Sequence, residues 1–417
     1  MNNSVWERLY QSLQKPQLYP VITGFNANID RVITVTPDML RSFEQHTVPG
    51  FDALLDRLKH SMRYCSADEV FISDYSLYHK LTDSFSTSGT LAIGGQAGIA
   101  AVHMRRLGIT SVTCAVPGAG PQTCNILKNA GVIPLTFDSG TDDSSDIIHL
   151  IFEYTPDMVP VADGIVPRRN RFIVSPVHDS STVIIPETFE NSFLKQISSY
   201  QRAFLSGYQY LRTEQEFITA SRQIQMIHRV HPLMRTHVEC VSGASRFVLE
   251  MMYRYIIPNT DSIGLNEQEL GMFMHGLRAT PPASAAILPS SPVTYVREII
   301  TFAEAMGVSR IHLHTFGYYI LILKTGTVQP ELSRSALLFA ARQTADTAGG
   351  DEQILSREGL QAYVDVSEEF GPEQTPGIFR VGDWVLVFIP TYISQNIQKT
   401  IGLGDILSST AFVSDPF

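Results

Sequence analysis

The chain of 417 residues exceeds what one hydrophobic core usually fills, so we expect a large domain and a smaller one. Hydrophobic residues make up 44% of the sequence and charged residues 17%, a composition typical of globular rather than disordered proteins. The formal net charge of −10 argues against binding to nucleic acid or to an anionic membrane. The four cysteines form no C-x-x-C pair, and no stretch resembles a signal peptide or a membrane span. We therefore expect a cytoplasmic protein with neither nucleic acid nor membrane as a partner.

Short apolar runs alternate with helical patterns along the chain, an alternation typical of an α/β protein with a largely parallel sheet. The stretch MNNSVWERLYQSLQKPQ predicts an amphipathic helix, and Val21–Thr23 predicts a buried strand. Further strands are expected in SVTCAVPG (111–118), IIHLIFEY (147–154), NRFIVSP (170–176), RTHVECV (235–241), SIGLN (262–266) and RIHLHTF (310–316). Helices are expected in QAGIAAVHMRRLGI (96–109), ALLFAARQTADTAGG (336–350) and SSTAFV (408–413).

Residues 31–88 show less sign of a buried parallel strand than the rest of the chain. They contain a polar helical stretch and the Ser/Thr-rich run LTDSFSTSGT. We therefore predict a smaller, discontinuous lid at residues 27–88 and 146–171. The larger α/β domain is then expected to comprise residues 1–26, 89–145 and 172–417.

The first stretch that could carry chemistry is GFNANID, which follows the first strand. Asn26, Asn28 and Asp30 alternate there, so in an extended segment their side chains would share one face. Two amides and a carboxylate offer both donors and acceptors, which suits a polyhydroxylated ligand at the end of a parallel strand. The same residues could instead satisfy backbone groups of the loop. The spacing leaves both interpretations open.

Two glycine-rich stretches precede predicted helices. Gly94 and Gly95 come directly before the helix that begins near Gln96, where backbone amides could approach a ligand closely. By itself this pattern favours a tight strand-to-helix turn over a binding site. The stretch VPGAGPQT (116–123) mimics a dinucleotide-binding fingerprint, but it lacks the third glycine and has Pro121 at the helix start. We therefore interpret it as a turn.

Acidic and histidine residues lie at the ends of three later strands. Glu239 in HVECVS and Glu269 in GLNEQEL could meet in space, and such oxygen ligands suit Mg²⁺ beside a polyphosphate. A glutamate at a helix start is more often a capping-box residue, and Glu267 or Glu269 could have that role. His312 and His314 have no third ligand of the right type nearby, so they indicate a pocket wall rather than a zinc site.

The cluster PRRNRF (167–172) places three arginines within four residues of an otherwise acidic chain. Their forked donors could grip phosphate groups, and the alternative is a solvated run of charge. Because Arg171 leads straight into an apolar strand, we favour a functional role.

A glycine-rich turn, GLGD, precedes the last predicted helix. Gly402 and Gly404 would let backbone amides hold an anion at the helix start. Asp405 could accept a proton from an incoming hydroxyl, as a catalytic carboxylate does in kinases. A plain aspartate N-cap is the alternative, and physical reasoning alone leaves the two about equal.

Together these stretches resemble one family in order along almost the whole chain, the ADP-dependent sugar kinases. This family comprises the ADP-dependent glucokinases and phosphofructokinases within the ribokinase-like fold. The matching stretches are GFNANID, GGQAGIAA with RRLG, PRRNRF, HVE, GLNEQEL, IHLHTFGYY and GLGDILSSTAF. A G-x-G-D motif alone would be a weak signal, whereas seven ordered matches are a strong one.

The resemblance implies a large three-layer α/β/α domain and a smaller α/β lid that closes over the sugar. It implies transfer of the β-phosphate of ADP to a hexose or hexose phosphate, with release of AMP, in a modified glycolysis. ADP would be the phosphoryl donor and Mg²⁺, or another divalent cation, the metal. The partners would be the sugar and ADP alone, and the protein a monomer or a small homo-oligomer.

The resemblance also assigns roles to residues. The sugar would be held by Asn26, Asn28, Asp30, Glu69, Gly94, Gly95 and Gln96. Glu239 and Glu269 would organise Mg²⁺, and the nucleotide would meet Arg171, His312 and His314. Asp405 would be the catalytic base, beside an anion hole formed by Gly402, Leu403 and Gly404.

The acceptor sugar is left open. Residues 154–166 contain no lysine or arginine, where we would expect phosphofructokinases to offer a cation for the sugar phosphate. Arg168 or Arg169 could still serve that phosphate, so both glucose and fructose 6-phosphate remain. The alternatives to this family are an ATP-dependent kinase of the ribokinase group and a non-catalytic sugar- or nucleotide-binding relative.

Overall fold

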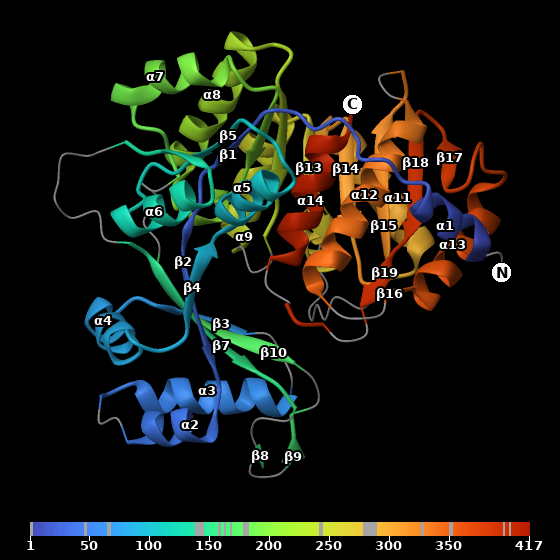
Figure 1. The fold of residues 1–417 in the computed structure, drawn as a ribbon. Coiled ribbons are helices and arrows are strands. Elements are labelled where there is room, and N and C mark those ends of the chain that lie inside the picture. Colours follow the sequence, from blue (N-terminus) through green and yellow to red (C-terminus); the bar gives the residue numbers. More distant parts are fainter. Residues whose placement is uncertain are drawn as a thin grey trace.

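The computed structural model describes residues 3–45, 48–64, 68–137, 146–156, 160–161, 164–166, 169–177, 183–241, 245–277, 290–326, 329–349, 353–394, 397–399 and 402–417. Within these residues the strands form a ten-stranded sheet and a five-stranded sheet, besides two short strand pairs. Figure 1 shows the smaller sheet and its helices below the larger body, joined to it by β2 and β4. Arg168 lies outside the described residues.

The ten-stranded sheet has the order β17-β18-β15-β14-β13-β12-β11-β1-β5-β6. The strands from β14 to β6 run parallel, and β15, β18 and β17 continue the sheet in antiparallel fashion. The parallel strands are β1 (Val21–Gly24), β5 (Val112–Ala115), β6 (Ile133–Leu135), β11 (Arg202–Leu205), β12 (Arg235–Glu239), β13 (Ser262–Asn266) and β14 (Arg310–His314). The antiparallel ones are β15 (Tyr318–Lys324), β17 (Ile378–Val381) and β18 (Trp384–Pro390).

Helices cover both faces of this sheet, because most of its strands are apolar on both sides. One face packs against α7 (Glu187–Ile197), α8 (Glu214–Val230), α9 (Arg246–Met251), α10 (Glu267–Leu277), α11 (Pro292–Met306) and α13 (Arg357–Phe370). The other packs against α1 (Asn3–Gln11), α5 (Gln96–Arg106), α6 (Pro121–Asn129), α12 (Pro330–Ala348) and α14 (Leu403–Ser414). The predicted α/β class and its three layers are confirmed.

The five-stranded sheet has the order β3-β10-β7-β2-β4. Its strands are β2 (Asn28–Thr34), β3 (Asp68–Ile72), β4 (Thr90–Gly94), β7 (Ile148–Tyr154) and β10 (Asn170–Pro176). An aromatic core that includes Phe43, Phe152 and Phe172 joins one face to α2 (Pro37–Glu44), α3 (Phe51–Tyr64) and α4 (Tyr75–Ser84). Because side chains alternate along a strand, Asp30, Glu69 and Arg171 lie on the opposite, open face.

The sheet pairing differs from the predicted domain limits at two places. Residues 89–94 and 172–176 were expected in the larger domain, yet β4 and the whole of β10 belong to the smaller sheet. Composition changes along the chain mark where polar segments begin, but strand pairing depends on partners far away in sequence. The division into two domains remains our prediction, with limits that follow the sheets.

The turn predicted at VPGAGPQT leads directly into α6. Pro121 does not interrupt this helix but is its first residue, after the N-cap Gly120. Proline is well suited to that position because its missing N–H would have had no partner inside the helix. The carboxylate of Asp146 accepts hydrogen bonds from the next two backbone amides.

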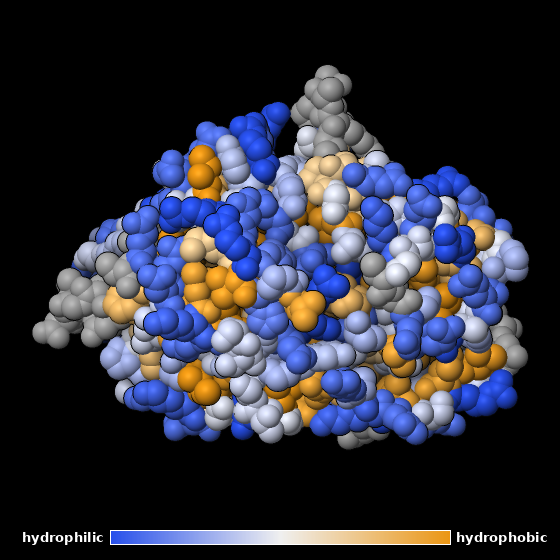
Figure 2. All heavy atoms as spheres, turned by 90° about the horizontal axis from the view of Figure 1, so that it is seen from above, coloured by the Kyte–Doolittle hydropathy of each residue, from blue (hydrophilic) through white to orange (hydrophobic). Residues whose placement is uncertain are grey.

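On the face seen from above, hydrophilic residues cover most of the surface and hydrophobic residues form separate patches (Figure 2). Among the described residues, no helix combines the length and the apolar character needed to cross a membrane.

Candidate active site

The candidate site lies where the open face of the smaller sheet meets the first turn of α14. The side chain of Asp405, in that turn, interacts electrostatically with Asp30, Arg171 and Glu269 and hydrogen-bonds Gln96. These residues come from β2, β10, α10 and α5. The structure therefore brings together residues spread from 30 to 405 in the sequence.

Asn28 and Asp30 form a buried pair at the start of β2. Asn28 Nδ2 donates a hydrogen bond to Asp30 Oδ1 over 2.7 Å. Gly94 lies opposite Asn28 in β4, and a Cβ there would overlap both side chains. Burial raises the pKa of Asp30 to about 7, with the charge of Glu69 adding to the rise and the Asn28 hydrogen bond and Arg171 opposing it. Asp30 therefore gains or loses a proton near neutral pH.

Asn26 plays a different part from its neighbours. Its side-chain oxygen accepts hydrogen bonds from the Ser206 hydroxyl and from the backbone amide of Ala97 in α5. Its carbonyl lies so close to Gly95, which has φ +72°, that a Cβ on Gly95 would approach within 2.6 Å. The GG turn thus has the tight geometry that the pattern alone favoured. Whether Asn26 and Gly95 also contact a sugar stays a prediction.

Glu69 and Arg171 face each other across the open side of the smaller sheet. The Ser175 hydroxyl donates a hydrogen bond to Glu69 Oε1 over 2.7 Å, and burial raises the pKa of Glu69. Burial lowers the pKa of Arg171, and the charges of Glu153 and Asp405 oppose that shift. Arg171 therefore interacts both with Asp405 and with the carboxylates Asp30 and Glu69 of the smaller sheet.

The first turn of α14 holds the predicted base. Gly402 is the N-cap with φ +71°, and Asp405 is the third residue of the helix, so the N-cap interpretation of Asp405 is wrong. Burial raises the pKa of Asp405 to about 7, the charges of Glu269 and Asp30 add to the rise, and the Gln96 hydrogen bond opposes it. A carboxylate with a pKa near neutral is well matched to accepting a proton in catalysis.

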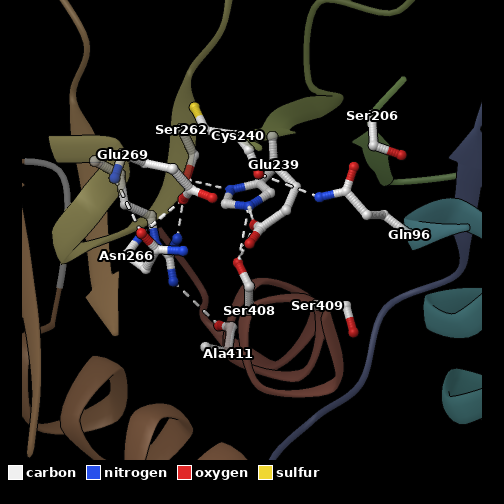
Figure 3. Close-up of polar contacts among 12 residues, drawn as sticks. Gln96, Ser206, Glu239, Cys240, Ser262, Asn266, Glu269, Ser408, Ser409 and Ala411 are labelled. Atoms are coloured by element: carbon white, nitrogen blue, oxygen red, sulfur yellow. Dashed lines mark hydrogen bonds and ion pairs between the residues drawn. The ribbon is translucent and has the colours of Figure 1, made fainter. Parts of the chain in front are cut away.

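Gln96 connects Asp405 to the larger sheet. Its amide nitrogen Nε2 donates to the Cys240 carbonyl over 3.2 Å, at the end of β12 (Figure 3). The same side chain hydrogen-bonds Asp405. Gln96 therefore fixes Asp405 relative to the strand that carries Glu239.

Glu239 is buried between the sheet and α14 and accepts a hydrogen bond from the Ser408 hydroxyl. His237 Nε2 lies 3.1 Å from Glu239 Oε2. Burial raises the pKa of Glu239 well above its usual range, and the charges of Asp405 and Glu269 add to the rise. Three carboxyl groups therefore repel one another here, a repulsion that a divalent cation would relieve.

Glu269 closes a reciprocal cap at the start of α10. Asn266 N donates to Glu269 Oε2 over 2.7 Å, and Glu269 N donates to Asn266 Oδ1 over 3.0 Å (Figure 3). The capping interpretation is therefore confirmed, while the carboxylate still faces Asp405 and Glu239. Among the described residues, no group of three or more Asp, Glu, His or Cys side chains is arranged to hold a metal directly. The hard oxygens of Glu239 and Glu269 fit a cation held partly through water.

A cavity of about 470 Å³ adjoins the first turn of α14. Its walls come from the ends of β13 and β14, from α12, from α14 and from β19 (Tyr392–Ser394). Leu403, Gly404 and His314 line this cavity. A Cβ on Gly404 would lie 3.2 Å from His314 Nε2. Burial lowers the pKa of His314 to about 4, so its imidazole is neutral.

His312 was expected to border the nucleotide together with His314 as part of a pocket wall, and the pocket-wall expectation is wrong for this cavity. It is fully buried and does not line the cavity. The two histidines share a face of β14, but His312 lies one residue pair deeper under the strand end, 5.8 Å from His314 between ring centroids. The spacing of two residues predicted that both histidines share a face of the strand, but it did not predict how deeply His312 is buried.

Several cavity residues were missed from the sequence. They are Thr344, Ala345 and Ala348 in α12, with Thr391, Tyr392, Ser394 and Leu407. The small residues Ala345 and Ala348, three positions apart on one helical face, are a signal of close approach that could have been used. No comparable signal marks β19.

The chain is similar to known proteins over almost its whole length. A model of the ADP-specific phosphofructokinase/glucokinase conserved region matches residues 19–414. The chain is 27% identical to the ADP-dependent glucose/glucosamine kinase of Pyrococcus furiosus, over 98% of each chain. It is 24% identical to the ADP-specific phosphofructokinase of Methanosarcina acetivorans, over 96% of this chain and 93% of that protein. An ADP-dependent kinase solved with fructose 6-phosphate and ADPβS has the same fold, with a TM-score of 0.78, 21% identity and coverage of 99% and 96%.

Proposed function

Because this chain belongs to the ADP-specific phosphofructokinase and glucokinase family, we propose that it transfers the β-phosphoryl group of ADP to a hexose hydroxyl and releases AMP. The family predicted from the seven motifs is thereby confirmed. The observation that carries the proposal is the place of Asp405. It lies between the open face of the smaller sheet, with Asp30 and Arg171, and the wall of the 470 Å³ cavity.

The reaction follows from that placement. Asp405 accepts the proton of the sugar hydroxyl while the hydroxyl oxygen forms a bond to the β-phosphorus of ADP. The bond between that phosphorus and the bridging oxygen breaks, and AMP leaves with the bonding electrons. The pKa of about 7 lets Asp405 take up this proton near neutral pH.

The first turn of α14 supplies an anion-binding site. The first intrahelical bond recorded there runs from Ile406 N to Gly402 O, so the amides of Leu403 and Gly404 precede the hydrogen-bonded ladder. These amides and the helix dipole favour negative charge on the transferring phosphoryl group. Arg171, which interacts electrostatically with Asp405, adds a positive charge.

Mg²⁺ would be held by Glu239 and Glu269 through water, and it would neutralise charge on the phosphates of ADP. The adenosine part of the nucleotide suits the cavity beside α14, which combines aromatic and small apolar walls with hydroxyl groups. His314 would then border the phosphate side of the nucleotide.

Within this reaction, we favour an uncharged hexose such as glucose as the acceptor. A sugar phosphate needs free cationic donors, yet Arg169 is bound to Glu153 over 2.8 Å. Arg171 interacts with four carboxylates, and Glu69 on the open face of the smaller sheet is one of them. Carboxylates accept hydrogen bonds from sugar hydroxyls, whereas they repel a phosphate.

AMP release tests the proposal. Purified protein is given ADP and Mg²⁺ with glucose or with fructose 6-phosphate, and each assay is repeated with ATP. We expect AMP with ADP and glucose, and a kcat/KM at least tenfold lower with fructose 6-phosphate. Equal or greater efficiency with fructose 6-phosphate would refute the choice of sugar. Turnover with ATP alone would point to the wider ribokinase group, and sugar binding without turnover would indicate a non-catalytic relative.

A further inference from the structure

A chain of buried polar groups runs beneath the candidate site to Glu239. Asp415 and Arg310 form an ion pair over 2.9 Å, and both side chains are 0% exposed. Arg310 Nη1 donates to Ser262 Oγ over 2.9 Å, and Ser262 Oγ lies 2.8 Å from His237 Nδ1. His237 Nε2 in turn meets Glu239 Oε2. The chain therefore connects the residue after α14 to a predicted cation ligand.

The chemistry of its members gives this chain a direction. A guanidinium has only donors, so the Ser262 oxygen accepts from Arg310 and its own hydrogen is available to His237 Nδ1. An Nδ1 that accepts carries no proton, and the proton of a neutral imidazole is then on Nε2. That N–H faces the side chain of Glu239. An ionised carboxylate has no donor, so in that form Glu239 accepts the hydrogen bond from His237.

Strand register places these groups with little freedom. His237, Ser262 and Arg310 are direct neighbours across β12, β13 and β14. Two residues further along these strands, Glu239 has Gly264 as its neighbour. A Cβ on Gly264 would overlap both Glu239 Oε2 and Ser408 Oγ. Figure 3 shows Ser262 and Glu239 on neighbouring strands above α14, with Ser408 directed toward Glu239. Gly264 thus leaves room for the carboxylate of Glu239, and the hydrogen-bond partners His237 and Ser408 occupy the space around that carboxylate.

The same arginine also fixes α14. Arg310 Nη2 donates to the Ala411 carbonyl over 3.3 Å, and Ser333 Oγ donates to Asp415 Oδ1 over 2.7 Å. The last turn of α14 is therefore tied to β14 and to α12. Since Asp405 lies at the other end of this helix, one buried network supports both the base and the predicted cation ligand.

We propose that Ser262, held by Arg310 and Asp415, is a positioning residue that fixes the tautomer and orientation of His237 and thereby aims Glu239 at the cation site. This inference deepens the proposed function and rests on it. Glu239 Oε2 is occupied by His237 and Ser408, which leaves Oε1 for water on the cation. Outer partners of this kind typically change metal affinity 10- to 100-fold when they are removed.

Ser262→Ala removes the single oxygen that links Arg310 to His237. The affinity of the folded protein for Mn²⁺ is measured by calorimetry with ADP present and sugar absent, beside the Mg²⁺ concentration for half-maximal AMP release. We expect both to weaken about tenfold or more, with the KM for the sugar unchanged within about twofold. The matched control is Ser221→Ala, a buried serine that accepts a hydrogen bond from Asn259 in another layer and that should leave cation affinity unchanged.

Ser262→Thr keeps the hydroxyl and suits a β-strand, so it should retain wild-type Mn²⁺ affinity within about threefold. The inference is overturned if Ser262→Ala binds Mn²⁺ as tightly as wild type while only its melting temperature falls. It is also overturned if the threonine variant is as weak as the alanine variant. A wild-type protein that binds Mn²⁺ but releases no AMP would refute the proposed function separately, and one that does neither would refute both.

Discussion

At the scale of single residues, the proposed chemistry depends on Asp405. It lies in a helix turn rather than on a strand, and it is the meeting point of Gln96, Arg171 and Glu269. Its pKa of about 7 results first from burial and then from neighbouring carboxylates. An aspartate with the usual pKa would be a weaker base by about three units and less effective in proton transfer.

Replacement of Asp405 by asparagine removes the proton acceptor but keeps the size of the side chain. We expect kcat for AMP release to fall about 10²- to 10⁴-fold, since this is the usual contribution of a positioned general base. Sugar binding, followed by calorimetry, should change by less than about threefold. Wild-type turnover in Asp405→Asn would show that Asp405 is not the base.

The pH dependence of kcat/KM tests the raised pKa directly. Asp405 must be ionised to act, and its pKa is raised from 3.8 to about 7, so activity should be full above that value. As the pH falls below about 7, kcat/KM should drop close to tenfold per pH unit. A profile that stays flat down to about pH 5 would contradict the raised pKa.

At the scale of secondary-structure elements, α14 is a helix that packs on the sheet through polar side chains as well as apolar ones. Ser408, Ser409 and Thr410 are all fully buried, and Thr410 Oγ1 lies 3.1 Å from His103 Nε2 in α5. Buried hydroxyls are tolerated because each finds a partner. The arrangement ties the helix that carries Asp405 to both β12 and α5.

Gly264 is the position where this packing is tightest. A methyl group there would overlap Glu239 Oε2 and Ser408 Oγ, so we expect Gly264→Ala to lower the free energy of unfolding by about 1–3 kcal/mol. It should also raise the Mg²⁺ concentration needed for half-maximal AMP release, because Glu239 must move. Ile263→Val, one residue away on the opposite face, should cost about 0.5–1.5 kcal/mol without changing the response to Mg²⁺. Denaturant titration and AMP release measure the two effects, and equal Mg²⁺ responses would argue against displacement of Glu239.

At the scale of the whole molecule, the candidate site is assembled from two sheets. Asp30, Glu69 and Arg171 come from the smaller sheet, Glu239 ends β12 of the larger sheet, and Glu269 lies in α10, which follows β13. A ligand that contacts both sets favours the conformation in which the sheets are closest. Closure of this kind excludes water from phosphoryl transfer.

Small-angle X-ray scattering can detect such a closure. With saturating glucose, AMP and Mg²⁺ we expect a smaller radius of gyration than in the ligand-free protein, because the lid would approach the larger domain. Glucose together with AMP forms a non-reacting mixture, so the bound state persists during the measurement. An unchanged radius with ligand bound would mean that the site is already closed.

Much of the fold followed from pattern alone. The apolar runs at 147–154 and 170–176 predicted two strands, and β7 and β10 are indeed an antiparallel pair. The order of strands in the larger sheet did not follow, since pairing joins segments such as β1 and β11 that are far apart in sequence. For the same reason the predicted domain limits miss β4.

The sequence by itself determined the family, the alternation of Asn28 and Asp30, and the glycine turn before Asp405, because these depend on residue type and short spacing. Only the tertiary structure decided that Asp405 is the third residue of a helix, that His312 is buried too deep to line the cavity, and that Asp415 reaches Glu239 through Arg310, Ser262 and His237. Depth and hydrogen-bond partners arise from strand register and helix packing. These join residues that are 25 to 105 positions apart, which no local pattern encodes.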